Sequence, residues 1–149
     1  MQATTLTELH ARVKKHLSEN DVRYSTGRQK FIAALHAAGG PRSATHLHTT
    51  ELDDVPLSSL YRTLTVLETV GVLERTHDGD GVAMFELGEW LLGHHHHLIC
   101  TSCDIVTDID LGDDLENAVA EISATVAASH GFTMTGHTLD VLGLCEDCG

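Results

Sequence analysis

Lysine and arginine are absent from the second half of this 149-residue chain. All nine lie within residues 1–75 beside eight Asp and Glu, whereas residues 76–149 hold fourteen Asp and Glu. The two halves therefore carry charges of +1 and −14, within a formal net charge of −13. This distribution excludes the second half as a surface for polyanions and suits it to holding cations, while the first half can face a polyanion. The asymmetry indicates two modules with different partners.

Long apolar runs are also absent, and nothing at residues 1–20 resembles a signal peptide. No segment is long and apolar enough to cross a bilayer, so we expect no membrane partner. Residues 1–20 are polar and lack the apolar core of a signal peptide. We therefore expect a cytoplasmic protein whose cysteines stay reduced.

All four cysteines belong to two Cys-x-x-Cys pairs, Cys100/Cys103 and Cys145/Cys148. Two such pairs are the ligand set of a closed tetrahedral zinc site, because a tight turn directs both sulfurs of a pair at one ion. Two disulfides or four buried thiols are the alternatives, and a reducing compartment disfavours the disulfides. We predict a structural zinc.

Four consecutive histidines, His94 to His97, end three residues before the first cysteine. The segment 94–100 lacks helical periodicity and is expected to be extended. Alternation in a strand places His94 and His96 on one face and His95 and His97 on the other. The run can therefore serve two separate metal sites; a merely polar strand is the alternative.

Apolar periodicity in the first half predicts helices followed by a hairpin. The expected strands, 72–75 and 82–86, flank a turn at residues 78–81. Together they indicate a winged helix-turn-helix, and a helical bundle with an incidental hairpin is the alternative. The expected helices cover about residues 5–19, 26–39, 43–52 and 58–71, with Thr26, Ser43 and Ser58 as N-caps of the last three.

The fourth expected helix has the features of a recognition helix, because its apolar positions leave a polar face near its N-terminal end. Arginine can bind guanine and tyrosine can contact a thymine methyl or a phosphate. The residues available there are Ser59, Tyr61, Arg62 and Thr65, with Arg23, Arg28 and Lys30 as further candidates for phosphate or minor-groove contact.

The second half is expected to form a small αβ unit. Strands at 105–109 and 137–144 flank a helix that ends near His130, and the zinc ties the ends of this unit together. So small a core needs the zinc and a partner chain. We therefore predict an α+β protein with a winged-helix domain at 1–87, a hinge at 88–93 and an αβ dimerisation domain at 94–149.

Two segments of the chain resemble the ferric uptake regulator family. They are Ser-Leu-Tyr-Arg-Thr-Leu at 59–64 and His-His-His-His-Leu-Ile-Cys-Thr-Ser-Cys at 94–103. The resemblance extends from about Tyr24 to Cys148. It implies a homodimeric, metal-activated transcriptional repressor that binds operator DNA, and not an enzyme.

The resemblance also implies roles for individual residues. DNA contacts would fall on Arg23, Arg28, Tyr61 and Arg62, and the structural zinc on Cys100, Cys103, Cys145 and Cys148. A site within the dimerisation domain would fall on His94, His96, Glu116 and His137. The regulatory site at the hinge would fall on Glu86, His95 and His97, with one more ligand from the DNA-binding domain.

That additional ligand is not evident in this chain. The histidine of iron regulators aligns with Pro41 or Arg42, and the cysteine of actinobacterial zinc regulators near the end of the wing is absent. Asp104 also stands where the family usually has glycine, which predicts local strain after Cys103. The fourth ligand stays open between His46, His48, His77, Glu89 and water.

The donor types favour zinc as the regulatory ion, because histidine nitrogens with a carboxylate suit zinc while also accepting Fe(II) or Mn(II). Iron regulators carry Asp within the histidine run, where this chain has His96. We therefore predict a repressor of metal-uptake genes that responds to zinc. An iron-responsive or peroxide-sensing regulator is the alternative within the family.

Two functions from other classes are remote. A zinc hydrolase would need an open metal position and a general base, and would leave Tyr61 and Arg62 without a purpose. A cytosolic metal buffer would suit the acidic half but would not need a winged helix.

Overall fold

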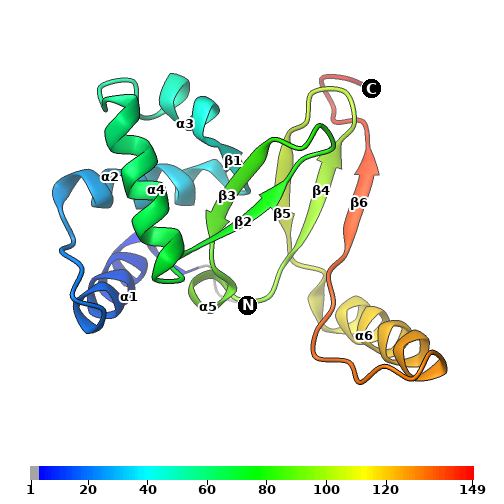
Figure 1. Cartoon of the computed structure of the whole chain (residues 1–149). Coiled ribbons are helices and arrows are strands. Elements are labelled where there is room, and N and C mark those ends of the chain that lie inside the picture. Colours follow the sequence, from blue (N-terminus) through cyan, green and yellow to red (C-terminus); the bar gives the residue numbers. More distant parts are fainter. Residues whose placement is uncertain (1–3) are drawn as a thin grey trace. The chain divides into compact units, whose positions relative to one another are not determined.

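The computed structural model of the chain describes residues 4–149, which form two compact units, one ending at His94 and the other covering His95–Gly149. Among these residues, a three-stranded sheet is combined with five helices in the first unit and with one helix in the second, so the predicted α+β class is confirmed (Figure 1). None of the described helices is long and apolar enough to cross a membrane. Whether residues 88–93 act as a hinge stays a prediction.

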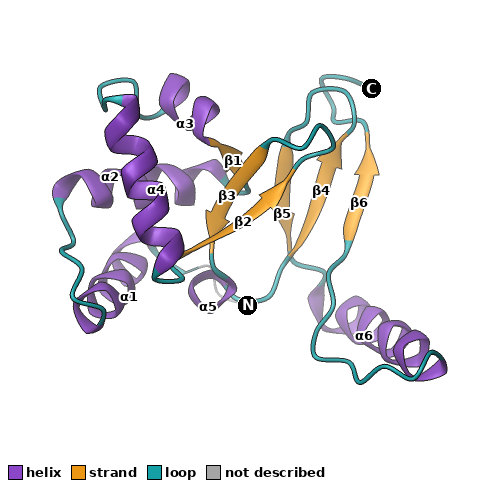
Figure 2. Ribbon diagram, viewed as in Figure 1, coloured by secondary structure: helices purple, strands orange, loops and turns teal. Residues whose placement is uncertain are grey.

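The first unit contains the expected helices and hairpin, coloured purple and orange in Figure 2. Its sheet has the order β1-β3-β2, and both pairings are antiparallel. Strand β1 and helix α5 were not expected from the sequence. The helices are α1 (Leu6–Glu19), α2 (Thr26–Ala38), α3 (Ala44–Thr50), α4 (Leu57–Thr69) and α5 (Glu89–Leu92), and the strands are β1 (Arg42–Ser43), β2 (Leu73–His77) and β3 (Ala83–Leu87).

Two of the three predicted N-caps are wrong. Ser25, not Thr26, caps α2: its backbone is extended and its hydroxyl accepts a hydrogen bond from the Arg28 N–H, while Thr26 is already helical. Pro56 holds the N-cap position of α4 without a side-chain bond, which places Ser58 inside the helix. Ser43 caps α3 as predicted, accepting from the His46 N–H.

Leucine and valine side chains at helical spacing make the core of the first unit. On α1, Leu9, Val13 and Leu17 are fully buried, and on α4 three leucines are at most 2% exposed. Each buried side chain of this size contributes about 1.5–3 kcal/mol relative to an exposed one. Helix α4 contacts β2, so the helix and the hairpin share this core, as a winged helix requires.

The second unit contains β4 (His96–Cys100), β5 (Val106–Ile109), α6 (Gly112–Ser129) and β6 (Asp140–Gly143). Strand β4 lies centrally, antiparallel to β5 and parallel to β6. No residue of α6 is buried, although its apolar residues recur at helical spacing. This helix therefore presents an apolar face that the single chain does not cover.

Candidate metal centres and nucleic-acid interface

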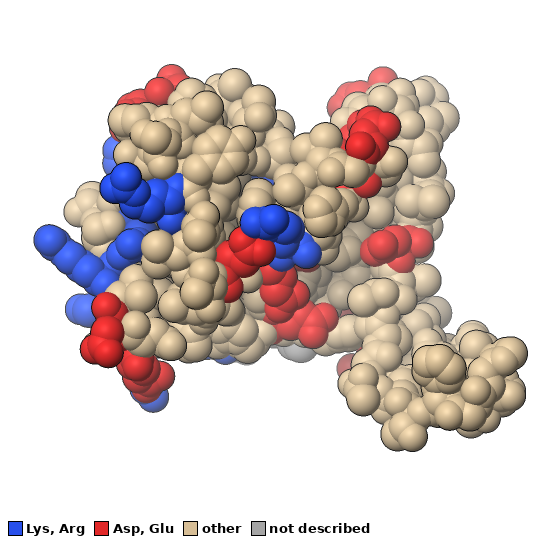
Figure 3. Space-filling model, in the orientation of Figure 1, with Lys and Arg blue, Asp and Glu red and all other residues tan. Residues whose placement is uncertain are grey.

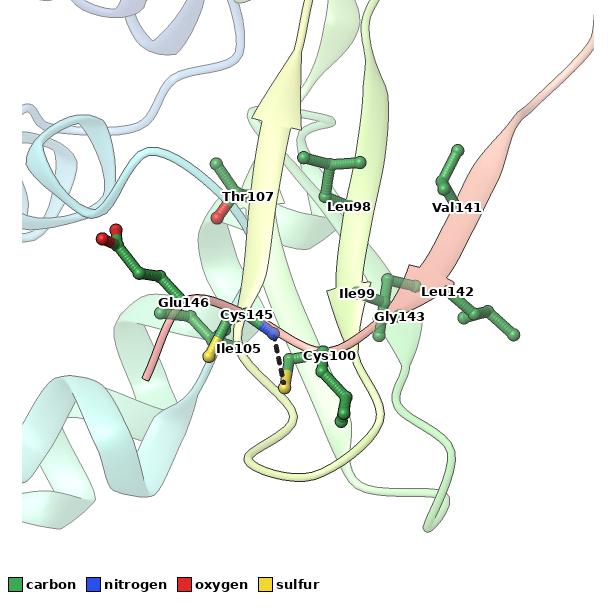
Figure 4. Close-up of a pocket in the computed structure, with 11 residues that line it drawn as sticks. Leu98, Ile99, Cys100, Ile105, Thr107, Val141, Leu142, Gly143, Cys145 and Glu146 are labelled. Atoms are coloured by element: carbon green, nitrogen blue, oxygen red, sulfur yellow. Dashed lines mark hydrogen bonds between the residues drawn. The ribbon is translucent and has the colours of Figure 1, made fainter. Parts of the chain in front are cut away.

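The four cysteines converge at one end of the second sheet, as Figure 4 shows for Cys100 and Cys145. Their sulfurs all lie within 4.8 Å of one another, and Cys103 Sγ is 3.7 Å from Cys145 Sγ. Sulfurs bound to one tetrahedral zinc at about 2.3 Å lie about 3.8 Å apart, whereas disulfide sulfurs lie about 2.05 Å apart. All four cysteines are unbridged. The arrangement thus fits a tetrahedral zinc site and not two disulfides.

Backbone N–H groups favour the thiolate form of Cys100. The Cys145 N–H has the largest effect, at 3.4 Å from the Cys100 sulfur, and the N–H groups of Cys103 and Ser102 add to it. Together they lower the pKa of Cys100 to about 6. The Ile105 N–H lowers the pKa of Cys103, but burial and the neighbouring thiols raise it to about 12. Because crowded thiolates repel one another, a cation is needed to hold all four ionised.

His96 on β4, Glu116 on α6 and His137 in the segment before β6 lie together. The two carboxylate oxygens of Glu116 reach one histidine each: Oε2 is 2.8 Å from His96 Nε2, and Oε1 is 2.9 Å from His137 Nε2. The two imidazoles stack with ring centroids 5.3 Å apart. His96 is only 1% exposed. Two nitrogens and a carboxylate in this arrangement match the donor types of a zinc or Fe(II) site.

His95 and His97, which alternate with His96 along the chain, meet a different carboxylate. Asp108 Oδ1 on β5 is 3.9 Å from His95 Nε2 and 3.7 Å from His97 Nε2. Tetrahedral ligands at about 2.1 Å from one ion are separated by about 3.4 Å, close to these distances. The two rings lie edge to face with centroids 5.3 Å apart. These three side chains can therefore converge on one metal ion.

Asp108 is the site residue that the sequence reasoning missed. It faces His97 directly across the antiparallel pairing of β4 with β5. Both strands were expected from the sequence, so a hairpin register counted across residues 100–105 is the signal that could have found it.

The other residues that the sequence suggested as metal ligands lie in the first unit. Glu86 is on β3 and is 5% exposed, an uncommon position for a carboxylate. Glu89 Oε1 is 2.9 Å from His94 Nδ1, and His94 is the last residue of that unit. His46 and His77 are exposed, on α3 and at the end of β2. Asp104, after Cys103, has a positive φ of 59°, the strain expected for a non-glycine residue there.

The exposed face of α4 carries the predicted DNA-contacting residues. Ser59 and Arg62 are exposed and Tyr61 is 50% exposed, whereas Leu60 and Leu64 are buried beneath them. Arg23 is exposed as well, and its backbone carbonyl accepts a hydrogen bond from the Arg28 guanidinium. In Figure 3 every blue Lys or Arg side chain belongs to the first unit. This unit is therefore where polyanion contact is electrostatically favourable.

One predicted phosphate contact is already paired. Lys30 Nζ lies 2.9 Å from Asp54 Oδ2, which raises the pKa of Lys30 and lowers that of Asp54. Both side chains are more than half exposed, so this ion pair is weak and a phosphate can compete for the lysine.

Residues 19–142 match the model of the ferric uptake regulator family. The chain belongs to this family. The ferric uptake regulation protein of Campylobacter jejuni is 29% identical over 143 residues, covering 92% of this chain and 86% of that protein. The zinc uptake regulation protein of Mycobacterium tuberculosis is 32% identical over 138 residues, covering 89% and 98%.

Solved structures of family members have the same fold. The Vibrio cholerae ferric uptake regulator superposes with a TM-score of 0.69 at 26% identity, covering 89% of this chain and 99% of that one. A zinc uptake regulator in complex with zinc and DNA superposes with a TM-score of 0.59 at 22% identity, covering 97% and 95%. The chain is thus a metal-responsive transcription regulator of the ferric uptake regulator family, with a winged helix and a dimerisation domain, and not an enzyme.

Proposed function

We propose that this regulator is a homodimer that binds operator DNA when loaded with metal and represses genes for metal uptake, with zinc as the regulatory ion. The observation that carries the proposal is the convergence of His95, His97 and Asp108 on the strands that follow the winged-helix unit. Nitrogen donors and a small coordination sphere suit zinc. The similarity to the M. tuberculosis zinc uptake regulation protein over 98% of its length supports this choice.

An iron-responsive or peroxide-sensing regulator is the second candidate. Two histidines with one carboxylate are the donor set of many Fe(II) sites, and Asp108 supplies that carboxylate. The similarity to the C. jejuni ferric uptake regulation protein also favours iron.

Residues of the first unit complete both histidine sites in this proposal. Glu86 joins His95, His97 and Asp108 as a ligand of the regulatory ion; its burial as a carboxylate supports a role other than solvation. His94 joins the second site with His96, Glu116 and His137 as the site's third histidine; it lies at the bend that precedes β4 and not in the extended segment expected from the sequence. The four cysteines would hold the structural zinc.

A second copy of the chain covers the apolar surface of the second unit. A hollow of about 440 Å³ is lined by residues of all three strands, among them Leu98, Thr107 and Val141 (Figure 4). Leu98 and Val141 are each 44% exposed, and Ile122 on α6 is 64% exposed, in the single chain. Exposed apolar patches of this kind mark association surfaces, and regulators of this family are dimeric. We therefore assign this face to the homodimer interface.

In the dimer, metal binding and DNA binding both favour one arrangement of the winged-helix and dimerisation units. A metal ion held by these residues would supply positive charge that offsets the repulsion between the carboxylates of Glu86 and Asp108. Shared ligation would then fix the winged-helix unit relative to the dimerisation unit, so that the two α4 helices keep the spacing of successive half-sites. Metal and DNA binding are then linked reciprocally, by about 1–3 kcal/mol in typical couplings.

Operator binding across a metal series tests the proposal. The dimer carrying only its structural zinc should be titrated onto operator DNA at buffered free zinc, Fe(II) and Mn(II), with fluorescence anisotropy as the readout. Activation at far lower free zinc than free Fe(II) or Mn(II) is expected. Activation by Fe(II) at the lower concentration would establish the iron-responsive candidate instead.

Arg62→Ala should weaken operator binding by about 1–3 kcal/mol per half-site, because it removes a groove contact of α4. Metal content should stay unchanged, since Arg62 belongs to the first unit and all four cysteines belong to the second. The matched control is Lys15→Ala, which removes one exposed positive charge from α1. A mobility-shift titration that shows equal losses for both variants would reduce the role of Arg62 to net charge.

A further inference from the structure

His97 has a carboxylate partner on each side of its ring. Nε2 lies 3.7 Å from Asp108 Oδ1 on β5, and Nδ1 lies 3.0 Å from Asp140 Oδ1 on β6. The 3.0 Å contact has hydrogen-bond length, whereas the 3.7 Å separation leaves room for an ion between the two atoms. The ring therefore has one hydrogen-bonding edge and one edge facing the proposed metal site.

The backbone places Asp140 beside His97. The two residues are register partners in the parallel pairing of β4 with β6, and the His97 N–H donates to the Leu139 carbonyl at 3.2 Å. Paired residues of adjacent strands project to the same face of a sheet. The strand ladder thus places the two side chains next to each other on one face of the sheet.

The contact determines which nitrogen can bind a metal. An ionised carboxylate only accepts hydrogen bonds, so a neutral imidazole beside Asp140 must carry its proton on Nδ1. Nε2 then presents its lone pair toward the side of Asp108. A carboxylate that accepts from the distal nitrogen also makes the ligating nitrogen more basic.

We propose that Asp140 is a positioning residue for the regulatory metal site: its carboxylate holds His97 in the Nδ1–H tautomer, with Nε2 presented to the ion. The inference rests on the proposed function, since it requires His95, His97 and Asp108 to be ligands of one metal. Asp140 itself is not a ligand in this arrangement, because it lies on the Nδ1 side of the ring while Asp108 lies on the Nε2 side.

The test compares Asp140→Ala, Asp140→Glu and the control Asp113→Ala in the dimer with its structural zinc retained. Asp113 is an exposed carboxylate in the first turn of α6, so its removal changes the same charge in the same unit. Zinc affinity is measured by competition with a chromophoric chelator, and the His97 tautomer by long-range ¹H–¹⁵N NMR before the regulatory ion is added.

Asp140→Ala should lose about 10–100-fold in zinc affinity and populate the Nε2–H tautomer of His97. Asp140→Glu should restore the Nδ1–H tautomer and most of the affinity, and Asp113→Ala should match the parent. Parental affinity in Asp140→Ala, an equal loss in Asp113→Ala, or an unchanged tautomer would each overturn the inference. If His97→Ala also keeps the regulatory zinc, the proposed site itself is wrong, which separates the two failures.

Discussion

Cys145→Ser should remove about one zinc per chain, because four thiolates form a closed structural site, and should dissociate the dimer. The Cys145 sulfur lies 3.7 Å from Cys103 Sγ, and its N–H donates to Cys100 Sγ, so this residue joins the end of the chain to the turn after β4. Few side chains of the second unit are buried, and structural zinc contributes about 10–16 kcal/mol in zinc-finger peptides. Without the ion, β6 and the apolar face that it carries should lose their order.

Native mass spectrometry reads zinc content and subunit number in one measurement. Asp147→Asn is the matched control, because Asp147 is exposed and lies between Cys145 and Cys148. This variant should keep both the zinc and the dimer. Retention of one zinc and of the dimer in Cys145→Ser would rule out the four-cysteine site. Loss of both the zinc and the dimer in Asp147→Asn would show that any substitution in this segment is disruptive, whether or not it removes a zinc ligand.

His97→Ala should abolish metal-activated operator binding while the dimer persists. The substitution removes one of the two nitrogens that face Asp108, and a coupling of about 1–3 kcal/mol corresponds to a 5–150-fold change in operator affinity. The cysteine site and the exposed apolar face of α6 lie elsewhere in the unit, so the oligomeric state should not change.

His96→Ala should have a milder effect on operator binding, because His96 contacts Glu116 and not Asp108. Its 1% exposure predicts a loss of thermal stability instead. His130→Ala, at the exposed C-cap of α6, is the control. Metal stoichiometry, operator affinity and melting temperature should be measured for all three variants. If His96→Ala and His97→Ala lose the same metal and fail alike, one shared site replaces the two.

Helix spacing in the first half of the sequence predicted the winged-helix unit well. The leucines of α1 and α4 recur at intervals that bury one face, and the turn at 78–81 separates two strands whose ends lie within two residues of those expected. The caps of α2 and α4 were less predictable, because serine, threonine and proline can each occupy several positions around a helix start. Helix α5 is a single turn, too short to show periodicity.

Local patterns in the sequence determined the chemistry of this protein. The Cys-x-x-Cys spacing directs paired sulfurs at one point, and strand alternation separates His96 from His95 and His97, since both depend on only a few neighbouring residues. Only the tertiary structure brought His97 against Asp108 and Asp140, which lie on the strands on either side of β4. For Glu116 on α6, which the family resemblance had already assigned to a site with His96 and His137, it supplied the contacts. Those contacts depend on strand register and on how a helix packs against its sheet. His97 lies 11 positions from Asp108 and 43 positions from Asp140 in the chain, so no short segment of the sequence encodes these contacts.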